Sequence, residues 1–298
     1  MNAAATRASQ LAVLLAGAAV LLGVSPRAGA GTVLGGSAID QALFSAGSCI
    51  SFASTAGHRT ATVFIDAGHG GPDPGAVGVT LTGKHVHEAD ETLRVALDAM
   101  AVLRPAGYRV VLSRTTAAAV ARPLPGDLSG AAFTGLGVHR DLVARDLCAN
   151  RARANILIGV YFNASGSAST GGSLTLYDAA RPFWRSSLRL AGLVQRAVLA
   201  RLNAGRSSIP DDGVRTDVGF GSSVTSADQA YGHLLILGPA KAGYFSTPSE
   251  MPGALVEPLF ITNPAEASIA DGGAGQQAIA RGLATAVEQY FHRSTPPR

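Results

Sequence analysis

A histidine between two glycines is the first residue in this chain whose sequence surroundings suit a functional role. His69 follows a short apolar run, residues 63–65, that is typical of a buried strand. Gly68 and Gly70 remove steric bulk on either side of it. Such a turn presents an imidazole at the carboxyl end of a strand, where open α/β sheets bind their ligands. His69 is therefore a candidate functional residue, although a lone histidine after a strand is weak evidence by itself.

A glutamate in an apolar stretch is the second candidate. Glu257 is the charged residue of 254–260, a segment that is otherwise typical of a buried strand. Burying a carboxylate there is costly unless it is paired or bound to something. Burial would also raise its pKa toward the range in which it can take a proton from water. The alternative is a structural salt bridge to an arginine such as Arg114 or Arg145.

A second glutamate, Glu88, stands at the start of a predicted helix. Apolar residues recur at helical spacing through 93–103, and Pro105 and Gly107 end the pattern. The helix dipole alone favours an acidic residue at this position. Taken alone, Glu88 therefore has a structural interpretation, as an acidic residue that the helix dipole favours.

The elements that must position these residues alternate between strand-like and helical patterns. Further strands are predicted at 108–113, 155–162, 171–177, 233–237 and 254–260, and helices at 88–103, 142–154, 183–202 and 276–291. This alternation predicts an α/β fold, a single domain with a mainly parallel twisted sheet and helices on both faces. Residues 115–138 and 207–231 are predicted to be long loops, the second one over the site.

The amino terminus is typical of a secretory signal peptide over residues 1–30. Arg7 supplies a positive charge, residues 11–24 are apolar, and residues 28–30 fit a small-residue cleavage site. A transmembrane anchor is the alternative, although the apolar run is short for that purpose. We expect a weakly structured amino-terminal extension at 31–60 and one catalytic domain at 61–293.

Composition and charge narrow the classes of protein. The chain has 298 residues, of which 47% are hydrophobic and 15% charged, as expected of a globular protein. Without the two arginines of the signal, 22 basic side chains face 20 acidic ones, a charge of +2 that does not indicate nucleic-acid binding. Cys49 and Cys148 could form one disulfide in an exported protein, and two buried free thiols are the alternative.

Residues 63–78, VFIDAGHGGPDPGAVG, resemble the opening motif of the zinc-dependent N-acetylmuramoyl-L-alanine amidases of bacterial cell-wall turnover, the amidase-3 type. The resemblance covers about 63–291, and the later motifs follow in the family's order. It implies that His69 and Glu88 bind zinc. It also implies that Glu257, which precedes an Asn-Pro turn at 263–264, is the catalytic acid and base.

The sequence departs from this family at the second zinc-binding histidine. Aligned on Asn163 and Ala164, that position holds Tyr161. A catalytic zinc normally has three protein ligands. Tyr161 could bind as a phenolate, although a free phenol has a pKa near 10. Alternatively, another side chain such as His139 or His233 substitutes, or the metal site is weakened.

The resemblance implies a function. The protein would be exported, periplasmic or cell-wall associated, without stable membrane insertion once the signal is removed. It would hydrolyse the amide between muramic acid and L-alanine of peptidoglycan, with zinc as cofactor. The alternative is a weakened or inactive homologue that binds peptidoglycan or a protein partner, and Tyr161 motivates it.

Overall fold

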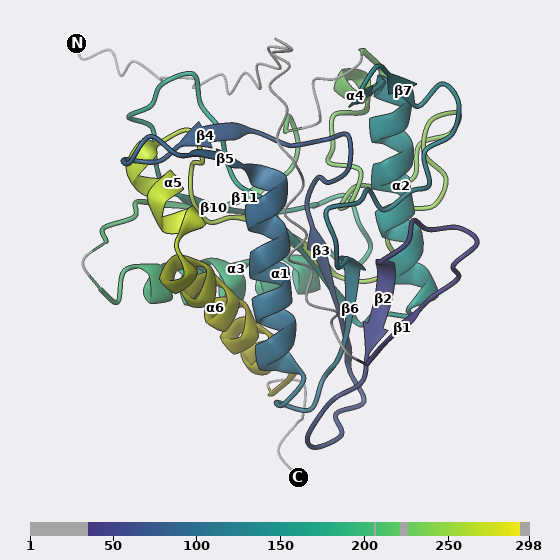
Figure 1. Ribbon diagram of the computed structural model, residues 1–298. Helices are drawn as coiled ribbons and strands as arrows, with labels where there is room; N and C mark the ends of the chain where they lie inside the picture. The colour runs from purple at the N-terminus through teal and green to yellow at the C-terminus, as the bar shows by residue number, and fades with distance from the viewer. Residues whose placement is uncertain (1–34, 206, 221–225, 293–298) are drawn as a thin grey trace, which may run out of the picture.

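The computed structural model describes residues 35–205, 207–220 and 226–292 of the chain (Figure 1). The predicted signal peptide at 1–30 lies outside these residues, so the structure does not test it. Among the described helices, none is both long enough and apolar enough to cross a membrane.

An eight-stranded mixed sheet forms the centre of the molecule. Its strands run in the order β1 (Gly36–Ala38), β2 (Ser48–Phe52), β6 (Arg109–Arg114), β3 (Thr62–Ala67), β9 (Ile156–Val160), β12 (Gly253–Glu257), β10 (Ser173–Tyr177) and β11 (Asp211–Thr216). The central run from β6 to β12 is parallel, whereas β10 is antiparallel to β12. The predicted α/β class with a mainly parallel sheet is confirmed.

Helices cover both faces of this sheet. On one face lie α1 (Glu88–Leu103), α3 (Trp184–Leu202) and α6 (Gly273–His292), which pack on one another and on the larger apolar core (Figure 1). On the other face lies α2 (Gly135–Arg151), whose small side chains join a second core. Every residue of β3 and β9 is buried, because both faces are covered, and this explains their nearly continuous apolar sequence.

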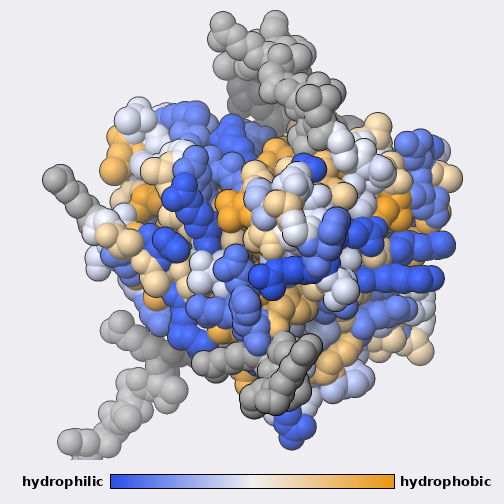
Figure 2. All heavy atoms as spheres, turned by 90° about the horizontal axis from the view of Figure 1, so that it is seen from below, coloured by the Kyte–Doolittle hydropathy of each residue, from blue (hydrophilic) through white to orange (hydrophobic). Residues whose placement is uncertain are grey.

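The remaining elements are short. Two hairpins, β4 (Val77–Val79) with β5 (His85–His87) and β7 (Leu128–Ser129) with β8 (Ala132–Phe133), lie outside the main sheet. The helix α4 spans Ser226–Tyr231, and α5 spans Pro264–Asp271. In the view from below, hydrophilic side chains cover much of the surface, and the apolar ones form separate patches (Figure 2).

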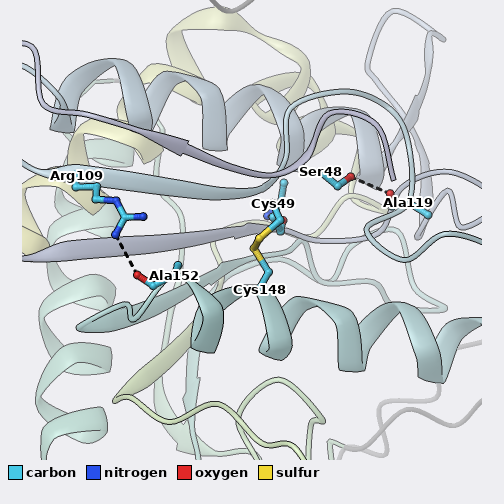
Figure 3. Close-up of a disulfide and its surroundings, with 8 residues drawn as sticks. Ser48, Cys49, Arg109, Ala119, Cys148 and Ala152 are labelled. Atoms are coloured by element: carbon cyan, nitrogen blue, oxygen red, sulfur yellow. Dashed lines mark hydrogen bonds between the residues drawn. A yellow bond between two sulfur atoms is a disulfide. The ribbon is translucent and has the colours of Figure 1, made fainter. Parts of the chain in front are cut away.

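A disulfide fastens the amino-terminal strands to the domain. Cys49 on β2 is bonded to Cys148 on α2, with their Cα atoms 5.6 Å apart (Figure 3). Ser48 donates to the carbonyl of Ala119 at 2.9 Å beside it. The predicted bridge is confirmed. The expectation of weak structure before residue 60 is wrong, because β1 and β2 complete one edge of the sheet.

Three other expectations need correction. The helix α2 begins at Gly135, where Thr134 caps it by accepting from the Gly137 amide, so the predicted loop at 115–138 contains a hairpin and a helix start. The predicted loop at 207–231 contains the paired edge strand β11. Residues 233–237 form turns rather than a strand. Most of their apolar side chains pack on the second core, on the α2 face of the sheet.

Candidate active site

The turn after β3 holds His69 in a strained backbone conformation. Its φ is 60°, in the left-handed region that non-glycine residues rarely adopt. The guanidinium of Arg145 donates to the His69 carbonyl at 2.6 Å and so fixes this turn. Strain of this kind persists only where the surroundings hold it, and it is frequent at functional sites.

Two carboxylates hold the imidazole of His69. Its Nε2 lies 3.0 Å from Oε1 of Glu88, and its Nδ1 lies 2.8 Å from Oδ2 of Asp73. Burial lowers the pKa of His69, but the charges and hydrogen bonds of the two carboxylates raise it to about 10. Burial conversely raises the pKa of Asp73, and His69 lowers it to about 2.

Backbone amides orient Glu88. Its Oε1 accepts from the Phe162 amide at 2.8 Å, and its Oε2 accepts from the Ala76 amide at 2.9 Å. A Cβ at Gly75 would lie 2.8 Å from both Glu88 and His69, so only glycine leaves room for the pair. Glu88 is buried at the first position of α1, as expected from the sequence.

Tyr161 lies beside His69 with its hydroxyl directed elsewhere. The two rings meet edge to face with their centroids 5.3 Å apart. The hydroxyl donates to Oδ2 of Asp66 at 2.9 Å. Burial and then the charge of Asp66 raise the pKa of Tyr161 well above its usual value, which keeps the phenol protonated. A Cβ at Gly68 would lie 2.6 Å from the Tyr161 ring, so this glycine admits the ring.

Glu257, the last residue of β12, has no charged partner. Its carboxylate forms neither an ion pair nor a hydrogen bond within the described part of the chain. Burial and then the charge of Glu88 raise the pKa of Glu257, His69 lowers it, and together they bring it to about 8. Val160 pairs with both Ala67 and Val256, so Glu257 and His69 follow aligned positions at the same end of the sheet.

The two arginines that could have paired with Glu257 are engaged elsewhere. Arg145 bonds to Asp66 at 2.8 Å and to Asp141 at 2.7 Å. Arg114 donates to backbone carbonyls, including that of Ala67 at 3.0 Å. The salt-bridge interpretation of Glu257 therefore does not hold for either arginine.

The two histidines named as alternatives to Tyr161 have neighbours other than His69. The ring of His139 packs on Tyr244, and His233 lies 2.8 Å from Asp178. His85 and His87 are exposed on β5.

The His69–Glu88 pair fits a metal ion. Nitrogen and oxygen ligands bind zinc at about 2.0–2.2 Å, so two ligand atoms of one ion lie roughly 3 to 3.5 Å apart, and Nε2 and Oε1 are 3.0 Å apart. A carboxylate on the second imidazole nitrogen, as Asp73 provides, orients metal-binding histidines. Asp73 was missed from the sequence, although its position four residues after His69 was a usable signal.

This fold, with a His–Glu pair and an unpaired carboxylate at the carboxyl ends of its central strands, is an arrangement that suits a metal-dependent hydrolase. The chain belongs to the Amidase_3 family of N-acetylmuramoyl-L-alanine amidases, whose sequence profile matches residues 63–289. The family is zinc-dependent and acts on peptidoglycan, and the expected family and activity are thereby confirmed.

Individual relatives agree with this assignment. The germination-specific N-acetylmuramoyl-L-alanine amidase of Bacillus subtilis (strain 168) is 25% identical over 238 residues, which cover 79% of this chain and 82% of the relative. The N-acetylmuramoyl-L-alanine amidase LytC of the same organism is 30% identical over 207 residues, 70% of this chain but only 31% of LytC. The solved CwlD amidase from Clostridioides difficile, in complex with the GerS lipoprotein, shares the fold with a TM-score of 0.58 at 19% identity, covering 78% of this chain and 100% of CwlD.

Proposed function

We propose that this chain cleaves the amide between the lactyl group of muramic acid and L-alanine, with His69 and Glu88 holding zinc and Glu257 acting as general base and acid. The observation that carries this assignment is the His69–Glu88 pair, 3.0 Å apart, at the same end of the sheet as a carboxylate that has no structural partner. Structural carboxylates in buried surroundings are normally paired.

The reaction needs a proton to be moved from water to the leaving amine. Zinc, when bound, polarises the amide carbonyl and acidifies water. Glu257 takes the proton of the attacking water and then delivers it to the nitrogen of L-alanine as the C–N bond breaks. Burial raises the pKa of Glu257 to about 8 without metal, so this carboxyl accepts a proton more readily than an exposed glutamate does.

Tyr161 supports the site without holding the ion. Its hydroxyl donates to Asp66, and its ring packs against His69 and so restricts the orientation of the imidazole. On this assignment, two protein side chains hold the ion, so its affinity is lower than that of a three-ligand site.

The place of action proposed for the protein is outside the cytoplasm. The chain belongs to a cell-wall amidase family, and its Cys49–Cys148 disulfide is consistent with export. We propose that residues 1–30 are removed as a signal, that residues 61–293 form the catalytic domain, and that the mature protein is periplasmic or cell-wall associated. Mass spectrometry of exported protein should then find an amino terminus near Gly31.

A weakened homologue that binds peptidoglycan without cleaving it is the second candidate function. The occupation of the histidine position by Tyr161, with its hydroxyl committed to Asp66, favours it. The two candidate functions differ in one measurable property, because only the first predicts hydrolysis of peptidoglycan.

The test uses the mature chain and purified peptidoglycan. We expect Zn²⁺ to support release of stem peptides that begin with a free L-alanine amine, and a chelator to stop the release. Sedimentation with peptidoglycan in the same samples measures binding. Binding without release at any zinc concentration would contradict the hydrolytic assignment and support the second candidate.

A further inference from the structure

Two buried carboxylates and an imidazole meet far from the candidate active site. Oδ2 of Asp178, Oδ1 of Asp217 and Nδ1 of His233 all lie within 4.8 Å of one another. Asp178 and Asp217 are 2% and 0% exposed. Glu257 pairs with Leu174 on the antiparallel strand β10. Asp178 follows Leu174 by four residues, and at 3.3 Å per residue this places the cluster about 13 Å along the sheet from Glu257.

The sheet itself brings the two aspartates together. Leu174 and Leu176 of β10 face the core on the α2 side of the sheet. Because alternate residues of a strand share a face, Asp178, two residues after Leu176, lies on the same side. The strands β10 and β11 are parallel, and the Asp217 amide extends their ladder by donating to the Tyr177 carbonyl at 3.0 Å. The aspartates are therefore neighbours just beyond the ends of two paired strands.

The three converging atoms lack hydrogen bonds. Nδ1 of His233 lies 2.8 Å from Oδ2 of Asp178 and 3.5 Å from Oδ1 of Asp217. Despite these short distances, none of the three atoms has a hydrogen-bond partner among the described residues. Buried carboxylate oxygens that lack such partners are costly. Three such atoms within 4.8 Å of one another are close enough to bind one cation.

The other oxygen of each carboxylate is held by the backbone. Oδ1 of Asp178 accepts from the Ala180 amide at 2.5 Å, and Oδ2 of Asp217 accepts from the Leu234 amide at 2.9 Å. These bonds fix the orientation of the two free oxygens, as outer contacts do at metal sites. The nearby Arg181 donates to the carbonyls of Gly238 and Ser249, so it forms no ion pair with either aspartate.

We propose that Asp178, Asp217 and His233 form a second metal site, structural in role, for a divalent transition cation such as Zn²⁺. An imidazole nitrogen with two carboxylate oxygens suits such an ion, whereas Ca²⁺ takes six to eight oxygen ligands. The ion would tie the ends of β10 and β11 to the segment that carries His233. That segment packs on α2 through Tyr231, Leu235 and Phe245, so the site would fasten it to the sheet.

The test counts zinc on the full mature chain. Wild type, Asp217→Asn and His233→Ala are stripped with a chelator, equilibrated with Zn²⁺ alone and freed of unbound ion before metal analysis. We expect each variant to hold one zinc per chain fewer than wild type. Asp146→Asn is the matched control, because Asp146 is also fully buried without a hydrogen bond but lies outside the three-atom cluster.

Two further measurements keep the result interpretable. His69→Ala separates this site from the proposed catalytic one, because it should retain the zinc that Asp217→Asn loses. If a variant fails to fold, anomalous scattering at the zinc edge from wild-type crystals should show a peak between the three side chains. Equal zinc content in wild type, Asp217→Asn and His233→Ala, or no such peak, would overturn the proposal, and the three groups would then be a histidine paired with two carboxylates.

Discussion

Tyr161 adds a second connection between His69 and Asp66, which Arg145 also joins. Its ring packs on His69, and its hydroxyl bonds to Asp66, which also pairs with Arg145. The same Arg145 holds the strained carbonyl of His69. A tyrosine here thus supports the turn, whereas on the proposed ligand set a histidine at the same position would offer a third ligand atom.

Substituting Tyr161 tests this interpretation. Tyr161→Phe should leave zinc content unchanged, because the phenol is not a ligand. It should cost about 1–2 kcal/mol in the free energy of unfolding, because it leaves an oxygen of Asp66 without its partner. Tyr161→His should raise zinc affinity and amidase rate together. The measurements are zinc stoichiometry, stem-peptide release and urea unfolding for the three proteins side by side. Loss of zinc from the Phe variant would show that Tyr161 is a ligand after all.

Single residues were predictable from the sequence where a local pattern marked them. Glycines around His69 and an apolar frame around Glu257 are such patterns. Asp178 and Asp217 carry no such mark, because each follows its strand in a polar segment and they meet only through sheet pairing. Their environment depends on contacts between distant parts of the chain, which one sequence does not display.

At the scale of elements, the disulfide between β2 and α2 joins residues 99 positions apart. Closing so long a loop removes much of the conformational freedom of the unfolded chain. We expect Cys49→Ala with Cys148→Ala to lower the free energy of unfolding by about 2–5 kcal/mol. Denaturant unfolding measures this, and a reductant should weaken wild type but leave the double variant unaffected. A loss below about 0.5 kcal/mol would show that strand pairing alone holds β2.

The start of α5 carries a pH-dependent contact. Glu266 is 5% exposed and accepts from the Phe260 amide at 2.6 Å. Burial raises its pKa to about 7 from an ordinary 4.5, although amide hydrogen bonds oppose the shift. The folded state therefore binds this proton more tightly than the unfolded state does. The contribution of Glu266 to the free energy of unfolding is therefore fully present below about pH 4.5, and it is lost as the pH rises through about 7.

Glu266→Gln should remove that loss, because a neutral amide keeps an oxygen for the Phe260 amide. Relative to wild type, the variant should gain on the order of 2 kcal/mol between pH 4.5 and pH 8. Urea unfolding at the two pH values measures the gain, with Glu250→Gln as the exposed control. An equal difference from wild type at both pH values would argue against a raised pKa in the folded protein.

The elements that the sequence predicted well are those buried on a regular pattern. The strands β3 and β9 and the helices α1, α3 and α6 were found within a few residues of their bounds. The edge strand β11, DDGVRT, was missed because it is polar and pairs on one side only. Residues 233–237 were wrongly expected to be a strand, because an apolar run packs equally well as a turn against a core.

At the scale of the whole molecule, sheet direction separates two sites. The parallel run β3–β9–β12 brings His69 and Glu257 to one end of the sheet. The antiparallel β10 and its parallel neighbour β11 bring Asp178 and Asp217 to the other end. One mixed sheet can thus carry a catalytic ion at one end and a structural ion at the other.

The central claim is that Glu257 moves the proton while other residues hold the metal. Glu257→Gln preserves size and removes the base, and the carboxylate has no structural partner to lose. The most direct measurement is stem-peptide release and zinc content of this variant beside wild type. We predict that release falls at least about a hundredfold with zinc content unchanged. Release at the wild-type rate, or loss of zinc, would contradict the role assigned to Glu257.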